Sequence, residues 1–324
     1  MNGPHCRPTL GNNARAMQDP DSGLLIVGSG AMASLFAARL APVTEVTMLA
    51  GWPQALAAIG AEGLRLGNGQ SERQIPMKIV DSTASLANVK RALVLVKAWQ
   101  TERVAAQLAA CLAPDGLALT LQNGLGNLQT LAQTLGEDRV ALGVTTYGAT
   151  LLGPGHVLPA GEGRIDLGAH QRIESFWLDL RSAGFDVRIV ENVTSLAWGK
   201  LTINAGINPL TALLRVPNGH LADQPDARSV LRDVVREVDE VAAGHGIALP
   251  FDDPFESVLE VAKRTAANLS SMLQDLARGA PTEIDAISGQ VVTWGQAAGV
   301  PTPVNEALWR LVRAAAAGGP HEGR

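Results

Sequence analysis

The sequence predicts an α/β N-terminal domain followed by an all-α C-terminal domain. Up to residue 191, short apolar runs alternate with helix-forming segments, as in a parallel sheet whose strands are joined by helices. From residue 192 the strand signal fades and long amphipathic patterns follow. The length of 324 residues suits one or two domains. We therefore place the first domain at 23–191 and the second at 192–317.

The composition excludes several classes of protein. Hydrophobic residues make up 46% and charged residues 18%, so the chain is globular rather than disordered. A net charge of -5 without a basic stripe argues against a nucleic-acid partner. No apolar run reaches the roughly 18 residues that span a bilayer. The two cysteines, Cys6 and Cys111, are too few for a disulfide framework, so a cytoplasmic protein is expected. Residues 1–22 lack the apolar segment of a secretory signal and are expected to be a flexible tail, and 318–324 a frayed one.

The elements of the first domain begin with an apolar run at 23–28 (GLLIVG) that ends at a glycine, as in a strand buried on both faces. The good helix former at 31–40 follows it. Helices are then expected at 101–111 and 127–135, and strands at 46–49, 92–96 and 117–121. Three more strands, at 140–144, 163–167 and 186–190, are expected to extend the sheet.

The second domain is expected to consist of amphipathic helices at 227–243, 255–276, 283–298 and 304–316. Helix-stop signals separate them: Gly244-His245-Gly246, Gly279-Ala280-Pro281 and Gly299-Val300-Pro301.

The junction between the first strand and its helix reads GSGAMA, from Gly28 through Ser29, Gly30, Ala31 and Met32 to Ala33. This GxGxxA pattern is a variant of the dinucleotide-binding fingerprint. The first glycine permits a tight turn, the second lets the backbone approach a pyrophosphate, and the helix N-terminus offers N–H groups to the phosphates. A glycine turn after a strand can also be purely structural. Its place on the first strand of an α/β pattern favours a Rossmann-type domain that binds NAD or NADP.

The residue that distinguishes NAD from NADP stands about 20 positions after this fingerprint. An acid there binds the ribose 2′-hydroxyl, and an arginine accommodates a 2′-phosphate. Residues 47–52 (TMLAGW) contain neither. Sequence position therefore does not choose between the two cofactors.

A run of polar residues stands out after position 198. Lys200, Asn204 and Asn208 follow at i, i+4 and i+8, so they share one face of a helix. They could line a site for a polar substrate, with the lysine as proton donor, or form a solvated face. Pro209 predicts that the helix ends or kinks at Asn208.

Polar residues also mark two segments near the C-terminus. Thr282 and Asp285 form a capping box, which predicts a helix with Glu283 in its first turn. This explains all three residues structurally, and a role for Glu283 in a site stays equally open. One face of the helix predicted at 255–276 would carry three polar residues: Asn268, Ser271 and Asp275.

Together these motifs resemble those of the ketopantoate reductase (2-dehydropantoate 2-reductase) family. The resemblance extends from Gly28 to about Asn305. It rests on seven blocks in order: GSGAMA at 28–33, KAWQ at 97–100, QNG at 122–124, WGKLTINAGINPLTA at 198–212, PNG at 217–219, NLSSMLQD at 268–275 and TEID at 282–285.

The resemblance implies roles for particular residues. Lys200 is the general acid, and Glu283 is a catalytic residue near the nicotinamide ribose and the substrate. The implied substrate-binding residues are Asn204, Asn208, Asn218, Asn123 and Ser271, with Ser271 holding the substrate carboxylate. Beside the glycine loop, the implied cofactor-binding residues are Lys97, Asn123, Ala149 and Glu283.

The implied reaction is reduction of 2-dehydropantoate by NADPH, a step toward pantothenate and coenzyme A, in a cleft between the domains. NADH stays an alternative, because Ala50, Gly51 and Trp52 stand where many members of the family carry an arginine. Arg65 and Arg73 are the arginines that could reach a 2′-phosphate instead. The histidines show no metal-ligand spacing, so no metal site is expected.

Two other functions remain open beside this one. A reductase of another 2-oxo or 3-hydroxy acid would share the glycine loop and the lysine. A non-catalytic nucleotide-binding sensor would need the loop but not Lys200 together with Glu283. The sequence also leaves open whether the protein is a homodimer.

Overall fold

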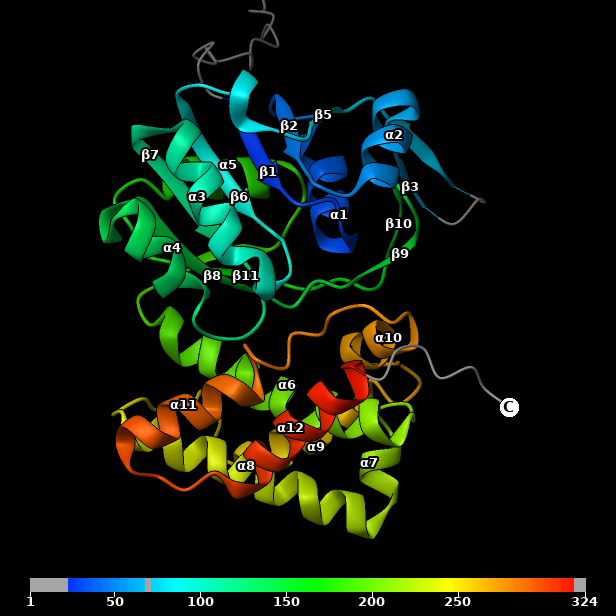
Figure 1. The fold of residues 1–324 in the computed structure, drawn as a ribbon, viewed down its shortest axis with the longest axis vertical. Coiled ribbons are helices and arrows are strands. Elements are labelled where there is room, and N and C mark those ends of the chain that lie inside the picture. The colour runs from blue at the N-terminus through cyan, green and yellow to red at the C-terminus, as the bar shows by residue number, and fades with distance from the viewer. Residues whose placement is uncertain (1–22, 68–70, 318–324) are drawn as a thin grey trace, which may run out of the picture.

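The computed structural model describes residues 23–67 and 71–317, and it has an α/β part and a helical part (Figure 1). The α/β part contains an eight-stranded sheet with the order β12-β11-β8-β7-β6-β1-β2-β5. Neighbouring strands are parallel except β8 and β11. The strands are β1 (Leu24–Val27), β2 (Val46–Leu49), β5 (Lys78–Val80), β6 (Val89–Val94), β7 (Leu112–Thr120), β8 (Val140–Thr145), β11 (Ile165–Gly168) and β12 (Val187–Val190).

Helices cover both faces of this sheet. The side chains of β1 show this, because they alternate between two cores. Leu24 and Ile26 pack in a core that includes Phe36 of α1, whereas Leu25 and Val27 pack in a second core with Leu108 of α3. Such alternation is the pattern of a doubly wound sheet. The helices of this part are α1 (Ala31–Leu40), α2 (Pro53–Glu62), α3 (Thr101–Cys111), α4 (Asn127–Leu135) and α5 (Glu174–Ser182), with 3-10 helices at Thr83–Ser85, Ala98–Gln100 and Glu137–Arg139.

A second sheet, which the sequence did not predict, lies beside α1. Its order is β4-β3-β10-β9, formed by β3 (Leu64–Leu66), β4 (Arg73–Ile75), β9 (Ala149–Gly153) and β10 (His156–Pro159). The expected strands at 140–144, 163–167 and 186–190 do extend the main sheet, as β8, β11 and β12. The glycine-rich and proline-rich segment between β8 and β11 instead pairs with residues 64–66, far away in the chain.

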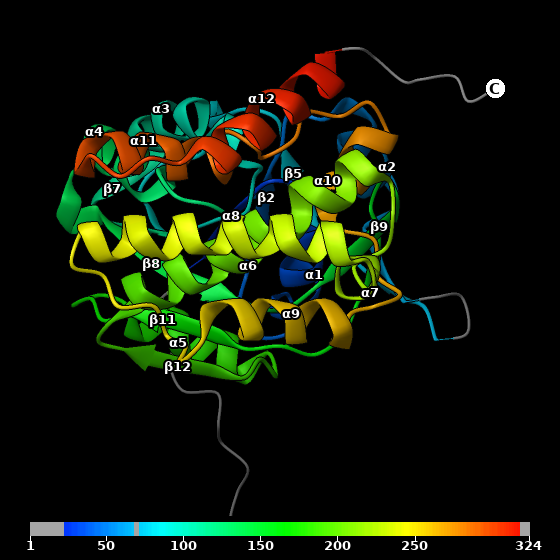
Figure 2. The same cartoon turned by 90° about the horizontal axis from the view of Figure 1, so that it is seen from below.

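The helical part is built around α6 (Val193–Leu214), which packs against five other helices and against β8 and β11 of the sheet. In Figure 2, seen from below, α8 lies in front of α6. The other helices are α7 (His220–Asp223), α8 (Pro225–Gly244), α9 (Pro254–Arg264), α10 (Ser271–Ala277), α11 (Ser288–Ala298) and α12 (Pro303–Ala317). Within the described ranges, no helix has both the length and the apolar character to span a membrane.

Two helix boundaries differ from the sequence prediction. Helix α6 does not end at Asn208 but continues through Pro209 to Leu214. The helix expected at 255–276 is two helices, because Ser270 caps a new one: its Oγ accepts a hydrogen bond from the Leu273 N–H at 3.2 Å. Asn268 therefore precedes α10 and does not share a helix face with Ser271 and Asp275.

The expected capping box at Thr282 is also wrong, since a bend at Glu283 and turns at 284–287 follow it and α11 begins only at Ser288. The Thr282 hydroxyl accepts from the Ile284 N–H at 3.5 Å, and the carbonyl of Glu283 accepts from Ala286 and Ile287. Asp285 is turned toward α12, where it accepts from the Trp309 indole at 2.7 Å. Glu283 is therefore carried by a tight loop and not by a first helical turn.

Buried Glu237 of α8 supports the helical part by capping α12. Its carboxylate accepts from the backbone N–H groups of Val304 and Asn305, both at 2.9 Å. We predict that Glu237→Ala lowers the free energy of unfolding by about 3 kcal/mol, because two buried donors lose a charged acceptor. Urea unfolding measures the loss, with exposed Glu240→Ala as control, which should change it by less than about 0.5 kcal/mol. Equal effects of the two variants would contradict this cap.

Candidate active site

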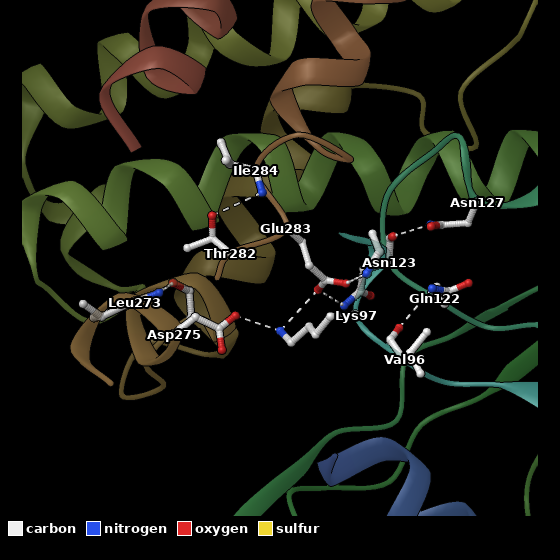
Figure 3. Close-up of polar contacts among 12 residues, drawn as sticks. Val96, Lys97, Gln122, Asn123, Asn127, Leu273, Asp275, Thr282, Glu283 and Ile284 are labelled. Carbon is white, nitrogen blue, oxygen red and sulfur yellow. Dashed lines mark hydrogen bonds and ion pairs between the residues drawn. The ribbon is translucent and has the colours of Figure 1, made fainter. Parts of the chain in front are cut away.

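A cluster of charged side chains lies where the carboxyl ends of two central strands meet the loop before α11 (Figure 3). Lys97 follows β6 and Asn123 follows β7, whereas Glu283 comes from the helical part. Ligands bind at this edge of doubly wound sheets. The site therefore combines residues from both parts of the chain.

Glu283 is the centre of this cluster, and it is only 6% exposed. One carboxylate oxygen accepts from the Ala98 N–H at 3.1 Å. The other accepts from Asn123 Nδ2 at 3.3 Å and pairs with Lys97 Nζ at 3.4 Å. A buried carboxylate needs such partners to stay charged. These contacts attach the loop of the helical part to two strand ends.

Lys97 also pairs with Asp275 of α10, with 2.8 Å between Nζ and Oδ2. Burial by itself would lower the pKa of Lys97, but the charges of Glu283 and Asp275 outweigh it and raise that pKa above its usual value. Asp275, itself 2% exposed, receives a second ion pair from Arg278 at 2.8 Å. Lys97 therefore holds its proton more firmly than an ordinary lysine, so it is poorly suited to donating one.

Lys200 of α6 lies in a different environment. It is partly buried, and its amine donates to the Thr145 carbonyl at 2.7 Å, at the end of β8. Burial lowers the pKa of Lys200 to about 8, and the charge of Glu283 opposes that shift without cancelling it. An amine with this pKa is protonated at neutral pH and gives up its proton readily, as a general acid must.

The other two polar residues of this face lie further along α6. Asn208 is buried and Asn204 is partly buried, so a fully solvated face does not describe them. Within 23–67 and 71–317, neither side-chain amide has a hydrogen-bond partner. Such amides can bind a polar ligand.

Asn218 and Ser271 are the remaining residues implied for the substrate. Asn218 is buried; its Nδ2 donates to Thr265 Oγ1 at 2.9 Å, and its Oδ1 is a buried acceptor without a partner in the described chain. Ser271 is the exposed first residue of α10. The serine before it, Ser270, is occupied as a helix cap and accepts from Thr211 Oγ1 at 2.8 Å.

The glycine loop has the backbone that a dinucleotide site needs. Gly28 has φ +126°, and a Cβ there would lie 3.3 Å from the Cβ of Ala33, which packs α1 against the strand. Among the described residues, a Cβ at Gly30 would meet no atom within 4 Å, and no side chain caps α1. A pyrophosphate thus has room above Gly30. It could also accept hydrogen bonds from the first turn of α1, which begins with Ala31 and Met32. Buried Ser29 lies between the two glycines.

The structure adds residues that sequence reasoning did not assign to the site. Asp275 was noted only for its place on a helix face, although it belongs to the NLSSMLQD block. Gln122 and Asn127 hold the loop around Asn123: Gln122 Nε2 donates to the Val96 carbonyl at 3.0 Å, and Asn127 Nδ2 to the Asn123 carbonyl at 2.9 Å.

Two further expectations concern Ala149 and metals. Ala149 is the first residue of β9 and pairs with Pro159 of β10, so it lies in the smaller sheet. Among the residues that the structure describes, no group of three or more His, Cys, Asp or Glu side chains could hold a metal ion.

Comparison with known proteins assigns both parts of the chain to one family. The family model described as ketopantoate reductase PanE/ApbA matches residues 24–172, and its C-terminal counterpart matches 192–316. A 2-dehydropantoate 2-reductase of Archaeoglobus fulgidus is 37% identical over 300 residues, which cover 90% of this chain and 97% of that protein. A second one, from Pyrococcus horikoshii, is 33% identical over 90% of this chain and 96% of its own.

Solved structures give the same result. A PanE/ApbA family ketopantoate reductase from Ralstonia eutropha JMP134 has a TM-score of 0.86 at 33% identity, over 92% of this chain and 100% of that one. D-mandelate dehydrogenase in a ternary structure with NADH and anilino(oxo)acetate has a TM-score of 0.84 at 26% identity, over 91% of this chain and 99% of that one. With its Rossmann-type sheet, its helical second part and relatives that match along nearly their whole length, this chain belongs to the ketopantoate reductase family of oxidoreductases.

Proposed function

We propose that this enzyme reduces 2-dehydropantoate to pantoate with NADPH, in pantothenate and coenzyme A biosynthesis, and that Lys200 is the general acid. The observation that carries the proposal is the environment of Lys200. Its amine donates to the Thr145 carbonyl, and burial brings its pKa to about 8. The names of the curated relatives support the substrate.

NADPH supplies the hydride that reduces the C2 ketone. The glycine loop at Gly28 and Gly30 would hold its pyrophosphate, and Lys97 and Asn123 would lie near its nicotinamide half. As the C2 carbonyl becomes an alkoxide, Lys200 Nζ transfers a proton to the oxygen and becomes a neutral amine, a form that burial favours. The Thr145 carbonyl keeps the amine in place, because it accepts one of its hydrogens.

The substrate-binding residues have separate tasks in this proposal. Asn204, Asn208 and Asn218 offer amide groups to the oxygens of the substrate. Ser271 holds the carboxylate. Glu283 orients the cluster and, through its charge, keeps Lys200 protonated at neutral pH.

A reductase of another 2-oxo acid is the second candidate, and one observation favours it. D-mandelate dehydrogenase, with anilino(oxo)acetate and NADH bound, has the same fold at a TM-score of 0.84. Steady-state oxidation of NADPH and of NADH, with 2-dehydropantoate and a panel of other 2-oxo acids, tests the two. A higher kcat/KM for 2-dehydropantoate than for every other acid is expected. Turnover with other acids only would overturn the assignment of the substrate.

Removing the Lys200 amine should stop proton transfer. We predict that Lys200→Ala lowers kcat by roughly 10²- to 10⁴-fold. The affinity for NADPH, measured by fluorescence titration, should change less than about twofold, because the Lys200 amine is held at the end of β8 and not at the glycine loop. Exposed Lys263→Ala on α9 is the control for loss of one positive charge and should keep full activity. A Lys200→Ala enzyme within about tenfold of the unmodified kcat would exclude Lys200 as the general acid.

The pH profile tests the coupling between Lys200 and Glu283. A general acid works only when protonated, so kcat/KM should be high below pH 8 and fall as the pH rises through about 8. Because the charge of Glu283 raises the pKa of Lys200, Glu283→Gln should move this falling limb to lower pH. The matched change at exposed Glu240, Glu240→Gln, should leave it in place. An unchanged or upward-shifted limb in Glu283→Gln would show that the two groups are not coupled in this way.

A further inference from the structure

The region after β2 lacks the arginine that would recognise a 2′-phosphate, since Ala50, Gly51 and Trp52 stand there. The structure brings an arginine to this place from another element. A Cβ built on Gly51 would lie 3.3 Å from Nη1 of Arg103, which belongs to α3. The guanidinium therefore lies against Gly51, in space that a side chain at position 51 would crowd.

The topology explains how α3 reaches the end of β2. Val27, the last residue of β1, is in register with Leu49 of β2 on one side and with Val94 of β6 on the other. The ends of these three strands form one edge, and the glycine loop begins on it at Gly28. Helix α3 follows β6 after a single 3-10 turn. Its first turns therefore lie on the edge where the adenosine half of a dinucleotide binds in this fold.

The Arg103 guanidinium is oriented but not neutralised. Gln100 Oε1 accepts from its Nη2 at 2.6 Å, which holds the planar group while Nη1 faces Gly51. Across 23–67 and 71–317, Arg103 forms no ion pair with a carboxylate, and its side chain is exposed. Its charge and remaining donors are free for an external anion, and a guanidinium binds phosphate oxygens in a bidentate manner.

The two arginines that the sequence suggested have other positions. Arg65 lies on β3 and Arg73 on β4, two paired strands of the smaller sheet. Neither strand belongs to the sheet edge that carries Gly28 and Gly51.

We propose that Arg103, positioned by Gln100, binds the 2′-phosphate of NADPH and thereby sets the preference for NADPH over NADH. The arginine thus comes from the helix after β6 and reaches the place that an arginine after β2 would otherwise fill. Gly51 is part of this arrangement, because its missing side chain makes room for the guanidinium. The inference rests on the proposed function only in taking NADPH as the cofactor.

Two nucleotides without nicotinamide test Arg103 directly. Adenosine 2′,5′-bisphosphate carries the 2′-phosphate, and 5′-AMP lacks it. By isothermal titration calorimetry, the full-length enzyme should bind the bisphosphate more tightly than 5′-AMP. Arg103→Ala should weaken binding of the bisphosphate roughly 10- to 100-fold and change the Kd of 5′-AMP less than about twofold, since only the 2′-phosphate loses a charged donor. Exposed Arg73→Ala is the charge-matched control and should behave as the unmodified enzyme.

A second variant separates charge from geometry. Arg103→Lys keeps the charge but loses the planar fork, so its affinity for the bisphosphate should fall between those of the unmodified enzyme and Arg103→Ala. An unmodified enzyme that binds both nucleotides equally would overturn the proposal, and so would an Arg103→Ala variant that keeps the preference. The binding ratio does not depend on which 2-oxo acid is reduced. Absence of 2-dehydropantoate turnover would therefore overturn the proposed function while leaving the assignment of Arg103 standing.

Discussion

The buried carboxylate of Glu283 is the interaction on which the arrangement of the site depends. Its three hydrogen-bonding or ionic partners, the Ala98 N–H, Asn123 and Lys97, all lie just after β6 and β7. A carboxylate in the interior is stable only when such donors surround it. The loop at 282–287 is therefore attached to one place on the sheet edge, and α6 is brought over the same edge with Lys200.

This one carboxylate affects two lysines in different ways. Lys97 is in contact with Glu283 and Asp275, and the two negative charges raise its pKa despite burial. Within the part of the chain that the structure describes, Lys200 forms no ion pair and interacts with Glu283 only through space, so burial prevails and its pKa falls to about 8. Groups whose pKa values are pushed apart in this way are suited to different roles at one site. Lys97 holds its proton in an ion-pair network, and Lys200 can exchange a proton.

The differences between predicted and observed elements have physical causes. A proline inside a helix costs one backbone hydrogen bond, but packing of α6 against helices on several sides outweighs that loss, so α6 continues past Pro209. The amphipathic pattern at 255–276 continues across the gap between α9 and α10. The second helix begins at Ser271 because the Ser270 hydroxyl accepts a hydrogen bond from the Leu273 N–H and caps it. The smaller sheet was missed because β10 pairs with β3, which comes from a distant part of the chain, and local sequence patterns do not show such a pairing.

By itself, the sequence determined those features that short-range chemistry sets. Apolar runs and helix-forming segments predicted α1, α3 and α4 at their observed bounds, the glycines predicted the open turn after β1, and the block around Lys200 predicted a polar face on α6. Tertiary structure decided which groups meet and how deeply they are buried: the ion pair of Asp275 with Lys97, the lowered pKa of Lys200 and the approach of Arg103 to Gly51. The reason is physical. Backbone periodicity and turn geometry act over a few residues, whereas burial and charge–charge distance are set by packing between residues far apart in the chain.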